Sequence, residues 1–267
     1  MSESSAHDQA GARLESVRLR DVRATEVSLV GARIRDVELT GADIRGSVLA
    51  RTRMRGVELF DLEISGELLH VVVNGVDIAP LVEAELDRRT PERVKMRPVD
   101  SDGFREAWAI LEGLWEETLA QARTFPETSL HTQVDEEWSF IETLRHLGFA
   151  SASWVGRMVL GKPDPWHPLD LPWDEAPGWD GIPWDRDVQP SLDEVLVVRR
   201  ERQAMVRDVM ASLTDERLTE RVSAPSPGWP PEDEEMPVAE CLRVVLNEEW
   251  HHRLFAERDL TRLKKES

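Results

Sequence analysis

Apolar residues recur at every fifth position between Val17 and Ile64. A period of five fits neither the 3.6-residue turn of an α-helix nor the alternation of a β-strand. In nearly every repeat a small or β-branched residue stands two positions before this central apolar residue. Such a short repeat predicts a solenoid, in which each unit buries its apolar residue by stacking on neighbouring coils. The central positions are Leu19, Ala24, Leu29, Ile34, Leu39, Ile44, Leu49, Met54, Leu59 and Ile64.

This stretch resembles the pentapeptide-repeat family, whose pattern is a small residue, any residue, Leu or Phe, and two polar positions. The resemblance implies a right-handed quadrilateral β-helix with coils spaced at about 4.8 Å. The run Leu68–Ile78 contains a turn signal at Asn74–Gly75 and is expected to cap the coil as paired strands. We therefore expect a flexible N-terminus at residues 1–12 and a capped β-helix at residues 13–80.

Helical periodicity begins only after residues 81–99, where a short helical stretch and a connection rich in Pro and Arg predict a linker. Residues 100–267 then carry four amphipathic stripes, each long enough for a helix of a bundle. We expect an α+β protein of two modules, whose second module is a four-helix bundle. The four predicted helices are Ser101–Arg123, Val134–Leu160, Ser191–Leu213 and Pro237–Leu263.

A connection of thirty residues, Gly161–Pro190, separates the second and third predicted helices and contains four tryptophans. It is too apolar to be disordered, so we expect it to pack over an end of the bundle and to form one wall of a pocket. Trp166, His167 and Trp173 are the candidates for binding a cofactor or substrate. The alternative is that the tryptophans only pack and that His167 is a surface residue.

The net charge of -19 opposes attraction to phosphate backbones and to anionic lipid, so neither nucleic acid nor membrane is the expected partner. No apolar run approaches the roughly 18 to 20 residues of a membrane helix, and the first residues lack the features of a secretory signal. We expect a cytoplasmic protein. The single cysteine, Cys241, excludes an internal disulfide and a cysteine-based zinc site, so a metal must use His and carboxylate ligands.

The predicted inward stripe of the last helix contains two polar residues, Glu248 and His252, at positions where apolar side chains are expected. Because an unpaired buried carboxylate costs several kcal/mol, the sequence must supply a partner, and a divalent metal ion is the economical one. His146 on the second helix is the expected third ligand, and three protein ligands leave a position open for substrate. The stripe reads Val238, Cys241, Val245, Glu248, His252 and Phe255.

Three further polar residues neighbour these ligands on the same predicted helix. His251 is turned about 100° from His252, which favours a structural role. Its functional alternative is a catalytic group that transfers protons near the open coordination position. Glu249 and Arg253 are expected to be solvated helix charges.

The segments WSFIETLRHL at Trp138–Leu147 and EEWHHR at Glu248–Arg253 resemble the DinB-like superfamily of four-helix metalloproteins. This superfamily includes the mycothiol-dependent maleylpyruvate isomerases and the bacillithiol transferases. The resemblance implies that His146, Glu248 and His252 bind a divalent metal, with zinc as the expected ion. Many members have His at the first position of the i, i+4 pair, and the Glu found here matches the maleylpyruvate isomerase branch.

The leading functional hypothesis is a metal-dependent S-transferase or isomerase that acts on a small electrophile with a low-molecular-weight thiol, such as mycothiol. A metal-dependent hydrolase of the same fold is the first alternative. The second is a non-enzymatic binding or protective protein that uses the β-helix. Residues 13–67 carry ten arginines and ten acidic residues, so the repeats have no net charge and DNA mimicry is disfavoured. The exposed end of the coil offers an edge for a homodimer.

Overall fold

The computed structural model describes residues 27–174, 176–179, 181–183, 185–226, 228–231 and 235–266. The chain divides into two compact units, Met1–Ser65 and Gly66–Ser267. The division lies before the run Leu68–Ile78, which the sequence analysis assigned to the repeat module. The expected flexible N-terminus, residues 1–12, lies outside the described residues, as do the first repeats.

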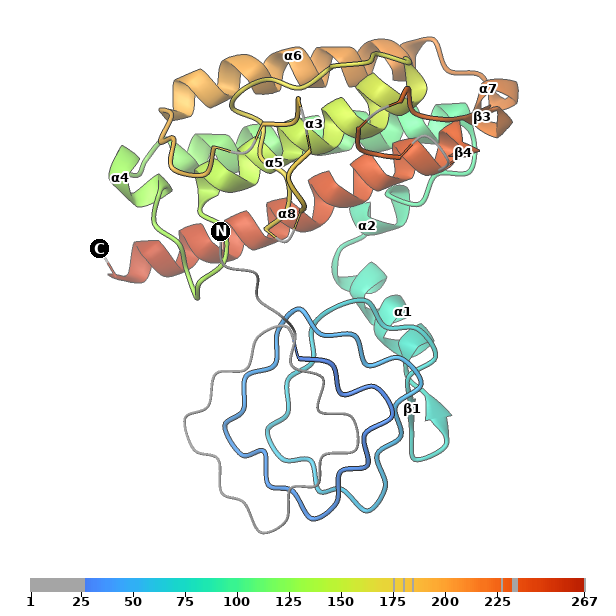
Figure 1. The fold of residues 1–267 in the computed structure, drawn as a ribbon, viewed down its shortest axis with the longest axis vertical. Coiled ribbons are helices and arrows are strands. Elements are labelled where there is room, and N and C mark those ends of the chain that lie inside the picture. The colour runs from blue at the N-terminus through green and yellow to red at the C-terminus, as the bar shows by residue number, and fades with distance from the viewer. Residues whose placement is uncertain are drawn as a thin grey trace. The chain divides into compact units, whose positions relative to one another are not determined.

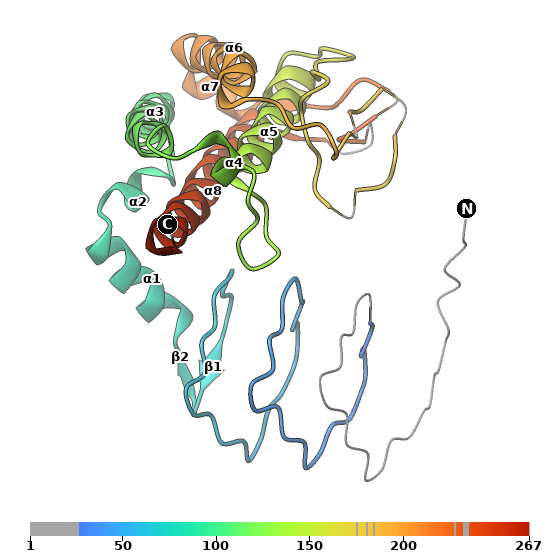
Figure 2. The ribbon, with the colours of Figure 1, turned by 90° about the vertical axis from the view of Figure 1, so that its left-hand side faces the viewer.

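Residues 27–65 run as successive open loops that lie side by side (Figures 1 and 2). A residue with positive φ recurs at every fifth position, so the sequence repeat is also a repeat of backbone conformation. The described part has no β-strand, and its central apolar residues, from Leu29 to Ile64, are 52% to 65% exposed. The positive-φ residues thus form the corners of a coil, and the described loops lack the strand ladder of a closed β-helix. The positive-φ residues are Gly31, Asp36, Gly41, Gly46, Arg51, Gly56 and Asp61.

The second unit begins with the predicted pair of strands, β1 (Val72–Val73) and β2 (Val76–Asp77), which are antiparallel. Asn74 and Gly75 have φ values of 49° and 86°, the left-handed conformation that a tight two-residue hairpin turn requires. Two short helices follow, α1 (Ala79–Arg89) and α2 (Glu92–Lys95).

Four helical segments pack against one another in the rest of this unit (Figure 1). Helix α5 contacts α6 and α8, and α3 contacts the same two helices. The π-helical segment η1 continues α5 without a break and packs on α8. Among the helices that the structure describes, none has the length and apolar composition of a membrane span. The segments are α3 (Ser101–Ala122), α5 (Phe140–Ser151) with η1 (Ala152–Val159), α6 (Leu192–Ala211) and α8 (Val238–Glu266).

Two helix starts differ from the prediction. The second helix begins at Phe140 and not at Val134, because Ser139 and Glu142 form a capping box that fixes the first turn. The last helix begins at Val238, because Pro237 belongs to strand β4 (Met236–Pro237), which pairs with β3 (Arg221–Val222). The remaining short helices are α4 (Glu127–Leu130) and α7 (Asp215–Thr219).

The core of the helical region consists of two apolar clusters, one around Trp108 and Leu242 and the other around Trp115 and Leu144. Charged residues of α6 and α8 are buried beside them. Arg199 donates two hydrogen bonds to the Glu249 carboxylate, of 3.2 and 2.7 Å, and the two side chains are 3% and 2% exposed.

The predictions that Glu249 and Arg253 are solvated were therefore wrong. Arg253 is 6% exposed, bonds Thr118 at 3.3 Å and pairs with Glu257. The buried face of α8 continues from Val245 through these two residues, whereas Phe255, placed on the predicted stripe, is 45% exposed. Each residue turns a helix by about 100°. Steps of three or four residues from Val245 therefore lead either to Glu248 and His252 or to Glu249 and Arg253, and only the packing of the helix shows which pair is buried.

We expect Glu249→Ala to lower the free energy of unfolding by about 3 to 5 kcal/mol, because it leaves the Arg199 guanidinium buried without its carboxylate. Urea denaturation followed by circular dichroism measures this loss. The double variant Arg199→Met/Glu249→Met removes both charges and should recover most of it. A loss below about 1 kcal/mol in Glu249→Ala would show that the pair is not buried as described.

Candidate metal centre

The side chains of His146, Glu248 and His252 converge between α5 and α8. Their ligand atoms all lie within 4.8 Å of one another. Glu248 Oε2 lies 3.3 Å from His146 Nε2 and 3.0 Å from His252 Nε2. The side chains are 9%, 31% and 19% exposed for His146, Glu248 and His252, so the group is enclosed but reachable from solvent through Glu248.

The second ring nitrogen of His146 determines which atom faces the carboxylate. His146 Nδ1 lies 3.1 Å from the carbonyl oxygen of Leu171, and a carbonyl only accepts hydrogen bonds, so Nδ1 carries the proton. In the neutral ring Nε2 then has a lone pair, which points at another acceptor, Glu248 Oε2. Two facing acceptors require either a proton or a cation between them.

The donor set and the spacing fit a divalent ion. Two imidazoles and one carboxylate form a ligand set of catalytic zinc sites. Two ligands of a tetrahedral zinc ion with bonds of about 2.0 to 2.1 Å lie about 3.3 Å apart, and the two nitrogen–oxygen distances are 3.3 and 3.0 Å. The hydrogen bond from Nδ1 to Leu171 is the partner that a metal-binding histidine normally has.

The charge of Glu248 is stabilised by the two histidines. Burial alone would raise the pKa of this carboxyl group. When protons instead of a metal ion lie between it and the two rings, the hydrogen bonds and positive charge of His146 and His252 outweigh burial and hold the pKa well below its usual range. Glu248 is therefore ionised at neutral pH and available as a ligand.

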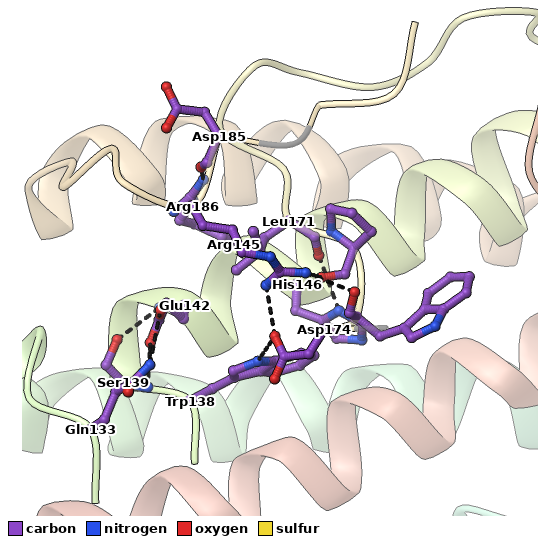
Figure 3. Close-up of polar contacts among 12 residues, drawn as sticks. Gln133, Trp138, Ser139, Glu142, Arg145, His146, Leu171, Asp174, Asp185 and Arg186 are labelled. Carbon is purple, nitrogen blue, oxygen red and sulfur yellow. Dashed lines mark hydrogen bonds and ion pairs between the residues drawn. The ribbon is translucent and has the colours of Figure 1, made fainter. Parts of the chain in front are cut away.

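The connection with four tryptophans, Gly161–Pro190 (the Trp-rich connection), is anchored on α5 next to His146 (Figure 3). Arg145 is 2% exposed, and its guanidinium donates to the carbonyls of Leu169, Val188 and Asp185. In return the Leu171 N–H donates to the Arg145 carbonyl at 3.2 Å. This attachment holds the Leu171 carbonyl against His146.

His167 helps to shape this connection and has no contact with the three ligands within the described residues. Its ring Nδ1 accepts a 3.1 Å hydrogen bond from the backbone N–H of Leu169, and the backbone N–H of His167 donates to the Asp170 carboxylate at 2.8 Å. Asp170, 1% exposed, also accepts from Arg202. The structure therefore places His167 in a turn and not beside the ligands.

Within the described residues, Trp166 and Trp173 connect to His146 through Phe149, whose ring centroid lies 6.3 Å from that of the histidine. Trp166 stacks on Phe149 at 6.4 Å and donates a 2.9 Å hydrogen bond to Ser153. Trp173 contacts Phe149 edge-on and also packs on Trp229, at 4.9 Å. Both candidates thus belong to an aromatic cluster beside the site, whereas Trp184 lies outside the described residues.

His251 is exposed and, within the described residues, makes no hydrogen bond to the three ligands. Desolvation by neighbouring atoms and the positive charge of Arg93 lower its pKa. The charge of His252 also lowers this pKa, whereas the charge of Glu248 raises it.

Sequence reasoning missed Trp138, whose ring packs on both histidines, at 4.4 Å from His146 and 5.5 Å from His252. It also missed Asp174, which accepts a 2.9 Å hydrogen bond from the Trp138 indole. Trp138 is the first residue of the segment that carries the family resemblance, and this location could have marked it as a candidate site residue. Nothing in the sequence marks Asp174 among the many acidic residues of the connection.

Residues 110–256 match the DinB superfamily, and residues 12–51 match pentapeptide repeats in eight copies. The first match spans more than half of the chain, which therefore belongs to the DinB superfamily, with a pentapeptide-repeat segment at its N-terminus. Both resemblances inferred from the sequence are thus confirmed. No curated protein and no solved structure matches the chain.

We expect Gly148→Ala to destabilise the protein and to weaken metal binding. A Cβ atom at Gly148 would lie 2.5 Å from Asp170 Oδ1, so the buried Asp170 carboxylate must shift, and we expect the turn that precedes Leu171 to move with it. Overpacking of this kind costs about 1 to 3 kcal/mol, and the displaced Leu171 carbonyl no longer orients His146. Urea denaturation and a zinc competition titration measure the two effects.

Gly113→Ala is the matched control, because Gly113 is an exposed residue inside α3 and a Cβ there meets nothing within 4 Å. It should raise the free energy of unfolding by about 0.5 to 1 kcal/mol, the difference in helix propensity. Unchanged zinc affinity in Gly148→Ala would contradict the role assigned to the Leu171 carbonyl.

Proposed function

We propose that the DinB region is a metal-dependent S-transferase or isomerase that acts on a small electrophile with a low-molecular-weight thiol, such as mycothiol, in the cytoplasm. A transferase would leave the thiol bonded to the product, and an isomerase would release it again. The observation that supports it best is the pair of facing acceptors, His146 Nε2 and Glu248 Oε2, with His252 Nε2 beside them. This arrangement offers three ligands on two helices and leaves one side of the site open. Membership of a superfamily that typically binds metal agrees with it.

The ligands, the Leu171 carbonyl and the aromatic cluster would have different roles in this reaction. His146, Glu248 and His252 would hold the ion, with zinc as the expected metal, and Glu248 would offset one of its positive charges. The ion, when bound, lowers the pKa of a thiol or water molecule that coordinates it. The Leu171 carbonyl keeps the His146 lone pair directed at the site, and the aromatic cluster with Trp166 and Trp173 excludes water on one side.

For the N-terminal segment we propose the closed right-handed quadrilateral β-helix and self-association into a homodimer. The positive-φ residue at every fifth position supplies the corners that such a coil needs. Closure of the coils would bury the central residues that are more than half exposed in the described loops, such as Leu39 and Leu49. The stacked coils of two chains would also pair their open edges.

Protein purified without a metal-affinity tag should contain about one divalent ion per chain, and His252→Ala should contain none. Elemental analysis measures the content. The control is His251→Ala, because the neighbouring His251 is exposed and should leave the metal in place. Metal in His252→Ala at the wild-type level, or its loss in both variants, would contradict the ligand assignment.

A thiol and an electrophile offered together distinguish the proposed reaction from its alternatives. With the zinc-loaded protein, glutathione as the first thiol probe and maleylpyruvate as the electrophile, turnover should require both metal and thiol. A rate independent of the thiol would favour the hydrolase alternative. Metal binding without turnover on any thiol tested would favour a binding protein.

A further inference from the structure

The two histidines of the candidate site differ in what orients their rings. The ring of His146 is fixed by its hydrogen bond to the Leu171 carbonyl. A metal-binding histidine normally has such a partner on its second nitrogen. Within the described residues, His252 contacts Glu248 through Nε2, and its Nδ1 has no hydrogen-bond partner. Another interaction must therefore hold the ring of His252.

The indole of Trp138 supplies that interaction. It stacks on the ring of His252 with a centroid distance of 5.5 Å and an interplanar angle of 19°. The same indole packs on His146 at 4.4 Å. Of the two histidine rings, Phe149 contacts that of His146 and Phe255 contacts that of His252, so among the described residues Trp138 is the aromatic side chain that packs on both.

The position of Trp138 is fixed in turn by the Trp-rich connection (Figure 3). The indole Nε1–H donates to Asp174 Oδ1 at 2.9 Å, and the same oxygen accepts from Arg186 at 2.7 Å. Arg186 also donates to the carbonyl of Trp173 at 2.8 Å, which ties it to the backbone beside Asp174. The indole is thus held by a carboxylate that is itself fixed.

We propose that Trp138 is a positioning residue for both histidine ligands and that Asp174 holds it in place. One segment of the connection, residues 171–174, then orients both rings: Leu171 acts on His146 through its carbonyl, and Asp174 acts on His252 through the indole. The inference rests on the proposed metal site, since it concerns the orientation of the ligands of that site.

Asp174 offers a mild test, because its side chain is 60% exposed and its loss should leave the core intact. Asp174→Ala should weaken zinc binding by about tenfold, the lower end of the effect of removing an outer partner of a metal ligand. Asp174→Asn keeps an oxygen that accepts from the indole and should bind zinc within about twofold of wild type. Competition with a chromophoric chelator gives the affinities.

Trp138→Leu removes the stacking face itself and should weaken zinc binding at least as much as Asp174→Ala. Its matched control is Trp179→Phe, because Trp179 packs on Trp173 and Trp229 and not on the histidines. Visible absorption of the Co²⁺-loaded proteins reports ligand geometry independently of stability and activity. The spectrum should change in Trp138→Leu and Asp174→Ala and remain that of wild type in Asp174→Asn and Trp179→Phe.

Wild-type affinity and Co²⁺ spectrum in both Asp174→Ala and Trp138→Leu would overturn the inference and leave the metal site standing. An equal loss of affinity in Trp179→Phe would also overturn it, because the effect would then belong to the aromatic cluster in general. Failure of the wild-type protein to bind either ion would overturn the proposed function together with this inference.

Discussion

The hydrogen bond between His146 Nδ1 and the Leu171 carbonyl is the interaction on which the candidate site depends. It places the proton of the imidazole on the side away from Glu248, so that a lone pair faces a carboxylate oxygen 3.3 Å away. Two acceptors at that distance favour a cation between them. The bond itself exists only because a long connection folds back over α5, so the chemistry of the site is tied to the path of a loop.

Buried guanidinium groups fix the backbone of this connection and join the helices that it packs on. Arg145 binds three backbone carbonyls of the connection, and Arg157, buried in η1, donates to the carbonyls of Pro163 and Pro225, which lie in two different connections. Arg199 fixes α6 to α8 through Glu249. A planar guanidinium has five donors in fixed directions and can serve several acceptors on different segments, whereas a lysine ammonium has only three donors on one nitrogen. The composition agrees with this use, since only four of the 33 basic residues are lysines.

Periodicity located the long helices well because an amphipathic helix repeats its apolar positions over many turns. It located their ends less well: Ser139, with Glu142 three residues later, gave the start of α5, yet the apolar pattern suggested an earlier one. The same pattern misassigned Glu249 and Arg253, because a stripe of alternating steps does not tell which of two adjacent faces turns inward. In the repeat segment the period predicted regular corners, and positive φ recurs every five residues as a result. It could not show whether the coils close.

The sequence by itself determined the two kinds of module, the helix that carries each candidate ligand and the one-turn spacing of Glu248 and His252, because these depend on short-range periodicity and on geometry within one helix. Only the tertiary structure decided that His146 meets that pair from another helix, which nitrogen of His146 faces Glu248, and that Trp138 and Asp174 surround the histidines. Those contacts join residues as far as 114 positions apart, as Trp138 and His252 are. They depend on how a thirty-residue connection packs, and the free energy of that packing is shared among many side chains and carbonyls that no local pattern identifies.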